Sequence, residues 1–162
     1  DSTWSRGQAW AVYGFTEMYR NTGNEAYLKQ ARTAADFILS HRYLPDDGIP
    51  YWDFNDPRIP DTFRDASSAA ILSSALYELR GFVGKSEAER YLSAADRIIT
   101  TLAGGEYRSP KKDTGSFILG GSVGSLPDRK EIDTPLTYGD YYYIEALLRR
   151  LKIIENQAEF KL

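Results

Sequence analysis

The chain has 162 residues, and its 20 basic and 23 acidic side chains give a formal net charge of −3 at pH 7. This length suits one domain with a substantial core, and the absence of a basic excess argues against nucleic acid as a partner. The sequence contains no Cys and a single His, which excludes disulfides, thiolate metal sites and multi-His zinc sites. We therefore expect no metal and no cofactor. No apolar run is long enough to span a membrane, so no membrane partner is expected either.

The first predicted helix covers residues 6–21 and opens within the segment 4–10, WSRGQAW. Ser5 and Gln8 have the spacing of a capping box, which predicts Ser5 as the N-cap. Arg6 and Trp10 are four residues apart and share one helix face. A guanidinium and an indole beside the free N–H groups of a helix start suit a sugar that bears a carboxylate. The alternative is that Arg6 is an exposed first-turn residue and Trp10 a core residue.

Four further helices are predicted from apolar residues at helical spacing and from cap residues. They cover residues 24–41, 65–81, 86–103 and about 137–155. Asn24 and Asp65 are predicted N-caps, and Ser86 with Glu89 forms a second possible capping box. Between the helices, only residues 116–119 suggest a short extended piece.

The connections between these helices alternate between short and long, which predicts antiparallel helical hairpins. In stacked hairpins the first, third and fifth helices start at one rim, and the third is rich in small residues that allow close packing. We therefore predict an all-α fold that forms an arc of an α/α toroid. Five helices cannot close such a ring. An upstream half of the same protein, or another association, is expected to cover the open apolar edge.

Several carboxylates lie near this rim, but none has a sequence neighbour that would raise its pKa as a general acid requires. Asp65 is a predicted cap and Asp140 a first-turn residue, and the remaining three lie in a Pro-rich loop. The five are Asp53, Asp56, Asp61, Asp65 and Asp140.

Four segments together resemble the unsaturated glucuronyl hydrolases of glycoside hydrolase family 88. They are WSRGQAW (4–10), GIPYWDF (48–54), RDASSAA (64–70) and GDYYYIEALLR (139–149), in order along nearly the whole chain. Gln8 and Ala9 favour this family over the related rhamnogalacturonyl hydrolases, which usually carry Asn-Gly at these positions. The resemblance implies an (α/α)6 toroid, with residues 1–162 as the C-terminal part of a single domain.

The resemblance also implies an activity, the removal of 4,5-unsaturated uronic acid from lyase-generated oligosaccharides by hydration of the vinyl ether. The family's essential Asp residues lie upstream of the first motif, so no catalytic residue is expected in this chain, which alone is expected to be inactive. Arg6 and Trp10 are implied to hold the unsaturated uronate, and Gln8, Ser122 and Ser125 are further candidate substrate-binding residues. Some members contact sulfate through a Ser-x-x-Ser-x-Lys loop, and here Pro127 replaces the Lys. A bacterial cytoplasmic or periplasmic location would follow.

Two alternatives stay open at this point. The chain could be a non-catalytic α-hairpin repeat that binds a glycan or a peptide, in which case it should fold completely alone. It could also come from an unsaturated rhamnogalacturonyl hydrolase.

Overall fold

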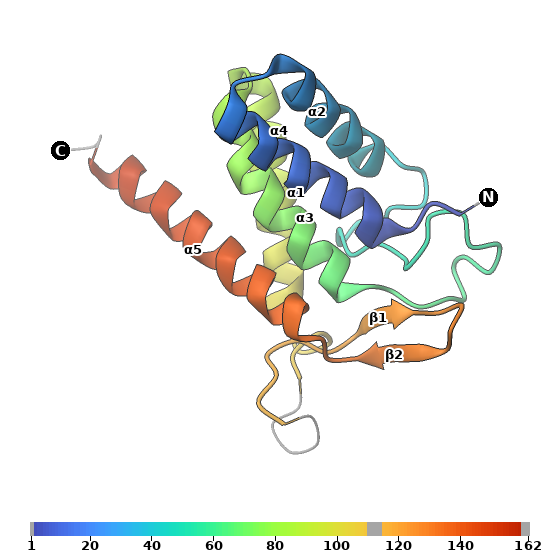
Figure 1. The fold of residues 1–162 in the computed structure, drawn as a ribbon. Coiled ribbons are helices and arrows are strands. Elements are labelled where there is room, and N and C mark those ends of the chain that lie inside the picture. Colours follow the sequence, from blue (N-terminus) through green and yellow to red (C-terminus); the bar gives the residue numbers. More distant parts are fainter. Residues whose placement is uncertain (1, 110–114, 160–162) are drawn as a thin grey trace.

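The computed structural model describes residues 2–109 and 115–159. In this part of the chain five α-helices pack together, and a two-stranded sheet, which lies between α4 and α5 in sequence, sits at one end of them (Figure 1). The elements are α1 (Ser5–Thr22), α2 (Glu25–Leu39), α3 (Ala66–Leu79), the 3-10 helix η1 (Arg80–Phe82), α4 (Lys85–Ala103), β1 (Ser122–Ser125), β2 (Lys130–Thr134) and α5 (Thr137–Glu159). The predicted helices and their order are confirmed.

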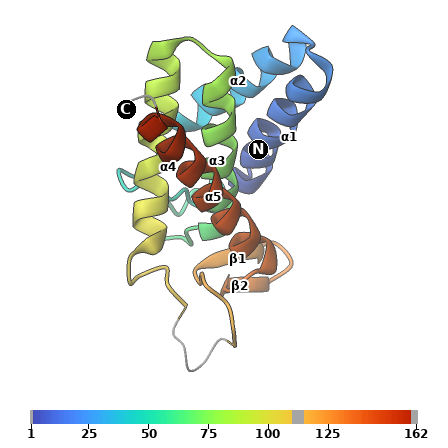
Figure 2. The same cartoon turned by 90° about the vertical axis from the view of Figure 1, so that its left-hand side faces the viewer.

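Helix α3 lies at the centre of the fold, with α1, α4 and α5 packed around it. All its residues except Glu78 are buried, and most of them are Ala, Ser or Leu, which let neighbouring helices approach closely. α1 pairs with α2, and α3 with α4, as hairpins (Figures 1 and 2). α3 contacts both α1 and α5, while α2 packs mainly against α1 and α4 mainly against α3, as the predicted arc of helical hairpins requires.

Two helix starts follow local sequence signals. The Asn24 side chain accepts a hydrogen bond from the Ala26 N–H at 3.0 Å, and α2 begins one residue later. The Asp65 carboxylate accepts from the N–H groups of Ser67 and Ser68 at 3.1 and 3.4 Å. Both predicted N-caps are therefore confirmed.

The two predicted capping boxes are wrong. α1 already includes Ser5, whose hydroxyl donates to the backbone carbonyl of Trp52 at 3.1 Å instead of capping the helix. The N-cap position belongs to Trp4, whose side chain makes no capping bond. α4 likewise begins at Lys85, so Ser86 lies inside it. The Ser5 hydroxyl is occupied by this tertiary hydrogen bond, and a local sequence pattern cannot reveal a partner so far along the chain.

The antiparallel pair β1–β2 is absent from the sequence prediction, which placed only residues 116–119 in an extended piece. Of those, Leu119 forms an isolated bridge with Arg108. Strands β1 and β2 are only four and five residues long, and each contains one large apolar residue, Val123 and Ile132. Strands this short carry little period-two signal.

Asp56 organises the long loop between α2 and α3. Its buried carboxylate accepts hydrogen bonds from the Trp52 indole, the Thr62 hydroxyl at 2.7 Å and the Arg58 guanidinium at 2.7 and 2.9 Å. The bonds from Arg58 are the largest influence that lowers the pKa of Asp56 below its ordinary value. This carboxylate thus helps to fix the loop that carries Trp52.

Asp56→Asn is expected to lower the free energy of unfolding by on the order of 2 kcal/mol at pH 7, because it removes the buried negative charge that accepts these hydrogen bonds. A lowered folded-state pKa stabilises above the unfolded pKa near 4, and this contribution is lost as pH falls further. Urea denaturation of both proteins at pH 7 and pH 3.5 should show the difference shrink at the lower pH. A constant difference would mean that the charge of Asp56 has no part in stability.

Helix α5 carries an apolar stripe with no partner in the described chain. Six large side chains on it are between 41 and 59% exposed, namely Tyr141, Ile144, Leu147, Leu148, Leu151 and Ile154. Figure 1 shows the C-terminal end of α5 diverging from the other helices. The apolar edge expected for an open arc is therefore present on this helix.

Candidate functional site

Arg6, at the start of α1, is buried and connects three parts of the chain. Its guanidinium donates to Asp65 at 3.0 Å and to the Ser67 hydroxyl at 3.2 Å, both at the start of α3. It also donates to the backbone carbonyls of Val123 and, at 2.6 Å, Gly124 in β1. Only 5% of Arg6 is exposed, so the alternative of an exposed first-turn arginine is wrong.

Asp65 is the fully buried partner of this arginine. Besides capping α3, its carboxylate accepts from the Val123 N–H at 3.3 Å. Burial is the largest influence on the pKa of Asp65 and raises it, while Arg6 opposes the rise by stabilising the charged form. The sequence identified both residues separately but not the pair, because 59 positions separate them and no local pattern joins such distant residues.

Aromatic rings surround the Arg6–Asp65 pair. The Arg6 guanidinium carbon lies 4.8 Å from the ring centroid of Trp4 and 5.2 Å from that of Tyr138, at the start of α5. One turn further along α1, Trp10 packs edge-on against Tyr142 with ring centroids 5.0 Å apart. Tyr138 and Tyr142 are also one helical turn apart. Arg6 and Trp10 therefore both face α5, as their shared spacing predicts.

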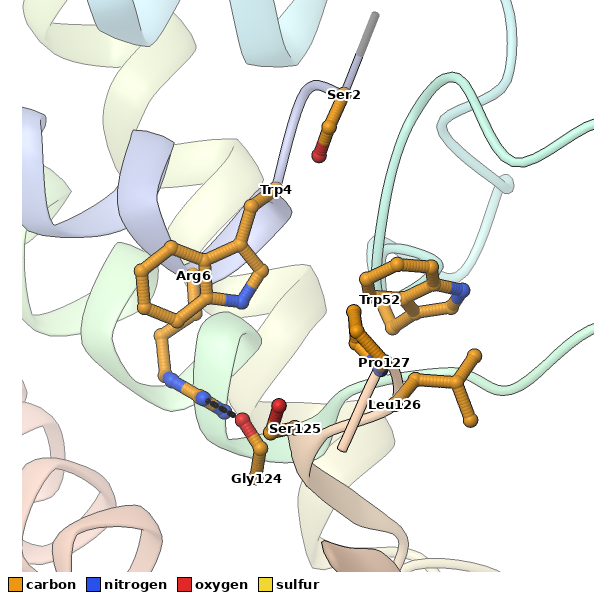
Figure 3. A pocket seen from close by; sticks show the side chains of 8 residues that line it. All are labelled: Ser2, Trp4, Arg6, Trp52, Gly124, Ser125, Leu126 and Pro127. Atoms are coloured by element: carbon orange, nitrogen blue, oxygen red, sulfur yellow. Dashed lines mark hydrogen bonds between the residues drawn. The ribbon is translucent and has the colours of Figure 1, made fainter. Parts of the chain in front are cut away.

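A cavity of about 380 Å³ opens beside Arg6 (Figure 3), a size typical of pockets for small molecules. In Figure 3 the indoles of Trp4 and Trp52 stand on opposite sides of it, and the Trp4 ring lies over Arg6. The lining residues come from the chain start, the α2–α3 loop and the β-hairpin, and they are Ser2, Trp4, Arg6, Trp52, Gly124, Ser125, Leu126 and Pro127.

The five candidate substrate-binding residues do not all lie in this cavity. Arg6 and Ser125 line it, whereas Trp10 and Gln8 are half-buried elsewhere on α1. Ser122 is fully buried with no hydrogen-bond partner for its hydroxyl, and lies against Gly139 at the start of α5. The structure therefore brings the five to one end of the fold but not into one cavity.

Six lining residues were not sequence candidates: Ser2, Trp4, Trp52, Gly124, Leu126 and Pro127. Trp4 and Trp52 belong to motifs that the sequence analysis singled out. An exposed Trp in a loop next to such a motif is the signal that could have identified them.

Most of the five aspartates considered as possible catalytic acids in the sequence accept hydrogen bonds from backbone N–H groups and so stabilise the local fold. Asp53 accepts from the N–H groups of Thr3 and Asn55 at 2.9 and 2.7 Å, and Asp140 accepts from two consecutive N–H groups in the loop before β1, both at 2.9 Å. With Asp56 and Asp65 bound as described, four of the five have structural partners, and Asp61 is exposed. Within residues 2–109 and 115–159, no three His, Cys, Asp or Glu side chains group together in a way that could hold a metal ion.

No helix in the described ranges combines the length and apolar character needed to cross a membrane.

Comparison with known proteins identifies the relatives of this chain. No protein-family model matches it. Over 154 residues it is 49% identical to an unsaturated glucuronyl hydrolase of Formosa agariphila, an alignment that covers 95% of the chain and 38% of the relative. The crystal structure of an unsaturated glucuronyl hydrolase specific for heparin superposes with a TM-score of 0.91 at 42% identity, covering 96% of this chain and 41% of that one.

A third match is a mutant unsaturated glucuronyl hydrolase from Streptococcus agalactiae, crystallised with dGlcA-GalNAc6S. Its TM-score is 0.82 at 28% identity, and the match covers 92% of this chain and 39% of that one. The chain thus corresponds to part of an α/α toroid. It is similar over nearly its whole length to unsaturated glucuronyl hydrolases, and it spans about two fifths of the length of these relatives.

Proposed function

We propose that this chain is the C-terminal, substrate-binding part of a glycoside hydrolase that removes a terminal 4,5-unsaturated uronic acid from lyase-generated oligosaccharides. The observation that carries the proposal is the meeting of Arg6, Asp65 and Tyr138, from the starts of α1, α3 and α5, beside an aromatic-walled cavity. It occurs in a chain 49% identical to an unsaturated glucuronyl hydrolase.

In the proposed reaction, water adds across the C4=C5 bond of the uronate. C4 takes a proton and C5 a hydroxyl, and the resulting hemiketal opens and releases the next sugar with its hydroxyl restored. The Asp that transfers the proton belongs to the upstream part of the protein. Arg6 and Trp10 hold the uronate, because a carboxylate at this end meets a guanidinium and the N-terminal ends of α1 and α5.

The upstream part is proposed to complete a single toroid domain with residues 1–162. The exposed stripe on α5 supports this, because an apolar helix face of this length is normally buried against another element. The coverage supports it too, since about three fifths of each relative has no counterpart in this chain.

The test uses the full-length protein that contains this segment. With an unsaturated glucuronyl disaccharide, we expect the ultraviolet absorbance of the C4=C5 bond to fall while the second sugar is released. A saturated disaccharide serves as the control and should remain intact. Stable absorbance with glucuronyl substrates contradicts the proposal, and turnover only of a rhamnogalacturonan-derived disaccharide favours the rhamnogalacturonyl hydrolases instead.

A further inference from the structure

We propose that Tyr13 and Glu145 are positioning residues, which fix the Trp10 indole in the orientation that binds the unsaturated uronate. Both would act through the ring of Trp10 without touching the substrate themselves. This inference rests on the proposed function, in which Trp10 holds the uronate, and adds to it two residues to which the sequence analysis assigned no role.

Trp10, Tyr13 and Tyr142 form a cluster of three rings from α1 and α5. The Trp10 ring meets the ring of Tyr142 edge-on at a centroid distance of 5.0 Å and that of Tyr13 at 6.3 Å. Tyr13 and Tyr142 also pack edge-on, with centroids 5.1 Å apart. Edge-to-face contacts have a preferred geometry, so the orientation of each ring depends on the other two.

Glu145 holds Tyr13 in this cluster. The Tyr13 hydroxyl donates to Glu145 Oε1 at 3.1 Å, and the hydroxyl of the buried Ser74 on α3 donates to Glu145 Oε2. Burial, and after it the nearby Glu145 carboxylate, raises the pKa of Tyr13 above its ordinary value. The Tyr13 hydroxyl therefore keeps its proton and remains a donor at neutral pH, and the carboxylate connects it to the central helix.

Arg149 places a positive charge beside both residues. Its guanidinium lies 3.7 Å from the Glu145 carboxylate, and the guanidinium carbon is 5.3 Å from the centroid of the Tyr13 ring. The same guanidinium binds Glu78 at 2.7 Å and donates to the Ser74 carbonyl at 2.7 Å. Glu145 and Arg149 are thus each bonded to α3 as well as placed next to Tyr13.

Packing alone does not explain why polar groups stand between α1, α3 and α5. Apolar side chains often stabilise such a place equally well, because removing charged groups from water costs about as much as their pairing contributes. A fully connected polar network adds a fixed geometry instead. Fixed geometry matters most at Trp10, because this half-buried ring is the one in the cluster that the proposed function places against the substrate.

The spacing along α1 places this network next to the proposed uronate site. Arg6, Trp10 and Tyr13 follow one another at four and three residues, so they share one helix face. On α5, Tyr142 and Glu145 are three residues apart and contact Trp10 and Tyr13 in the same order. Tyr13 therefore lies about one turn beyond Trp10, on the side away from Arg6. A ring oriented in advance loses little further freedom when the ligand binds.

The experiment measures kcat and KM of the full-length protein on an unsaturated glucuronyl disaccharide, with Tyr13→Phe as the principal variant. This change removes one hydroxyl and keeps the ring. KM should rise about three- to tenfold, as expected for one lost hydrogen bond, while kcat stays within about twofold, because a loosened Trp10 weakens ground-state and transition-state binding alike. Glu145→Ala should act in the same way. Glu145→Gln keeps an acceptor oxygen and should bring KM back to within about twofold of the unsubstituted value.

Two further variants test whether the effect passes through Trp10. In a Trp10→Leu background, Tyr13→Phe should change kcat/KM by less than about twofold, because the ring that Tyr13 orients is gone. Tyr19→Phe is the matched control and should leave KM unchanged. Tyr19 also lies on α1 and donates to a glutamate, Glu25, at 3.2 Å, but it is six residues further from the site than Tyr13.

The outcomes separate this inference from the proposed function. A fall in kcat at unchanged KM indicates a smaller folded fraction, which thermal unfolding of each variant detects, and it overturns the positioning role. An equal effect of Tyr13→Phe with and without the Trp10 ring overturns it as well. Normal turnover with an unchanged KM in Tyr13→Phe and Glu145→Ala leaves the proposed function intact and removes this inference alone. If the unsubstituted protein does not turn over the disaccharide, both fail.

Discussion

Replacing Arg6 with alanine is expected to lower the free energy of unfolding by about 3–5 kcal/mol, because it leaves the buried Asp65 carboxylate without its ion-pair partner. The carbonyls of Val123 and Gly124 also lose their donor. Urea denaturation of the full-length protein measures the effect. Arg32→Met is the matched control, since the exposed Arg32–Glu87 pair should contribute less than about 1 kcal/mol.

A double variant separates the structural part of Arg6 from its part in binding. Arg6→Met with Asp65→Asn removes both charges, while Asn still caps α3. It should recover about 2 kcal/mol or more of the loss, because no buried charge is left unpaired, yet remain inactive on unsaturated uronates. A double variant as unstable as Arg6→Ala would assign the loss to the β1 carbonyls, and an active one would remove Arg6 from uronate binding.

Two aspartates on the stripe of α5 are expected to prevent this segment from joining the rest of the protein. Leu148 and Leu151 are 54 and 49% exposed here, so burial of the remaining half of each side chain would contribute about 1 kcal/mol. When the two parts of the protein are expressed separately and mixed, Leu148→Asp with Leu151→Asp should weaken their association by more than about 100-fold. Calorimetric titration measures the affinity.

The same substitutions should leave unfolding of the isolated segment nearly unchanged, since both leucines already face solvent in it. Thr33→Asp on the exposed face of α2 is the control and should not alter association. Equal affinity of the variant and the unsubstituted segment would show that another surface meets the upstream part.

Local patterns predicted the helical architecture because the signals lie within each helix. The Asn24 and Asp65 side chains cap their helices by accepting hydrogen bonds from N–H groups two or three residues later. The many small residues of α3 indicate that this helix is closely surrounded by others. Ser5 shows the limit of this reasoning, because its hydroxyl binds the carbonyl of a residue 47 positions away. Only the folded chain reveals such a competing partner.

The sequence indicated only part of the candidate site. It selected Arg6 and Ser125, which line the cavity, and it predicted Asp65 as a helix cap. The Arg6–Asp65 ion pair and the Trp4–Trp52 cavity join positions that are distant along the chain, which no local pattern links. The β-hairpin was missed altogether, since its strands of four and five residues are too short to show a clear alternating pattern. Its backbone nevertheless supplies two of the acceptors for Arg6.

Arg6 holds the β-hairpin through hydrogen bonds to two main-chain carbonyls of β1, those of Val123 and Gly124. The amino acids at the hairpin tip, Leu126 and Pro127 among them, are therefore free to be exchanged while the anchored frame beneath them keeps its shape. In the proposed hydrolase, changes of sugar specificity should accordingly be sought at this tip, where a side chain can be replaced with little effect on the fold.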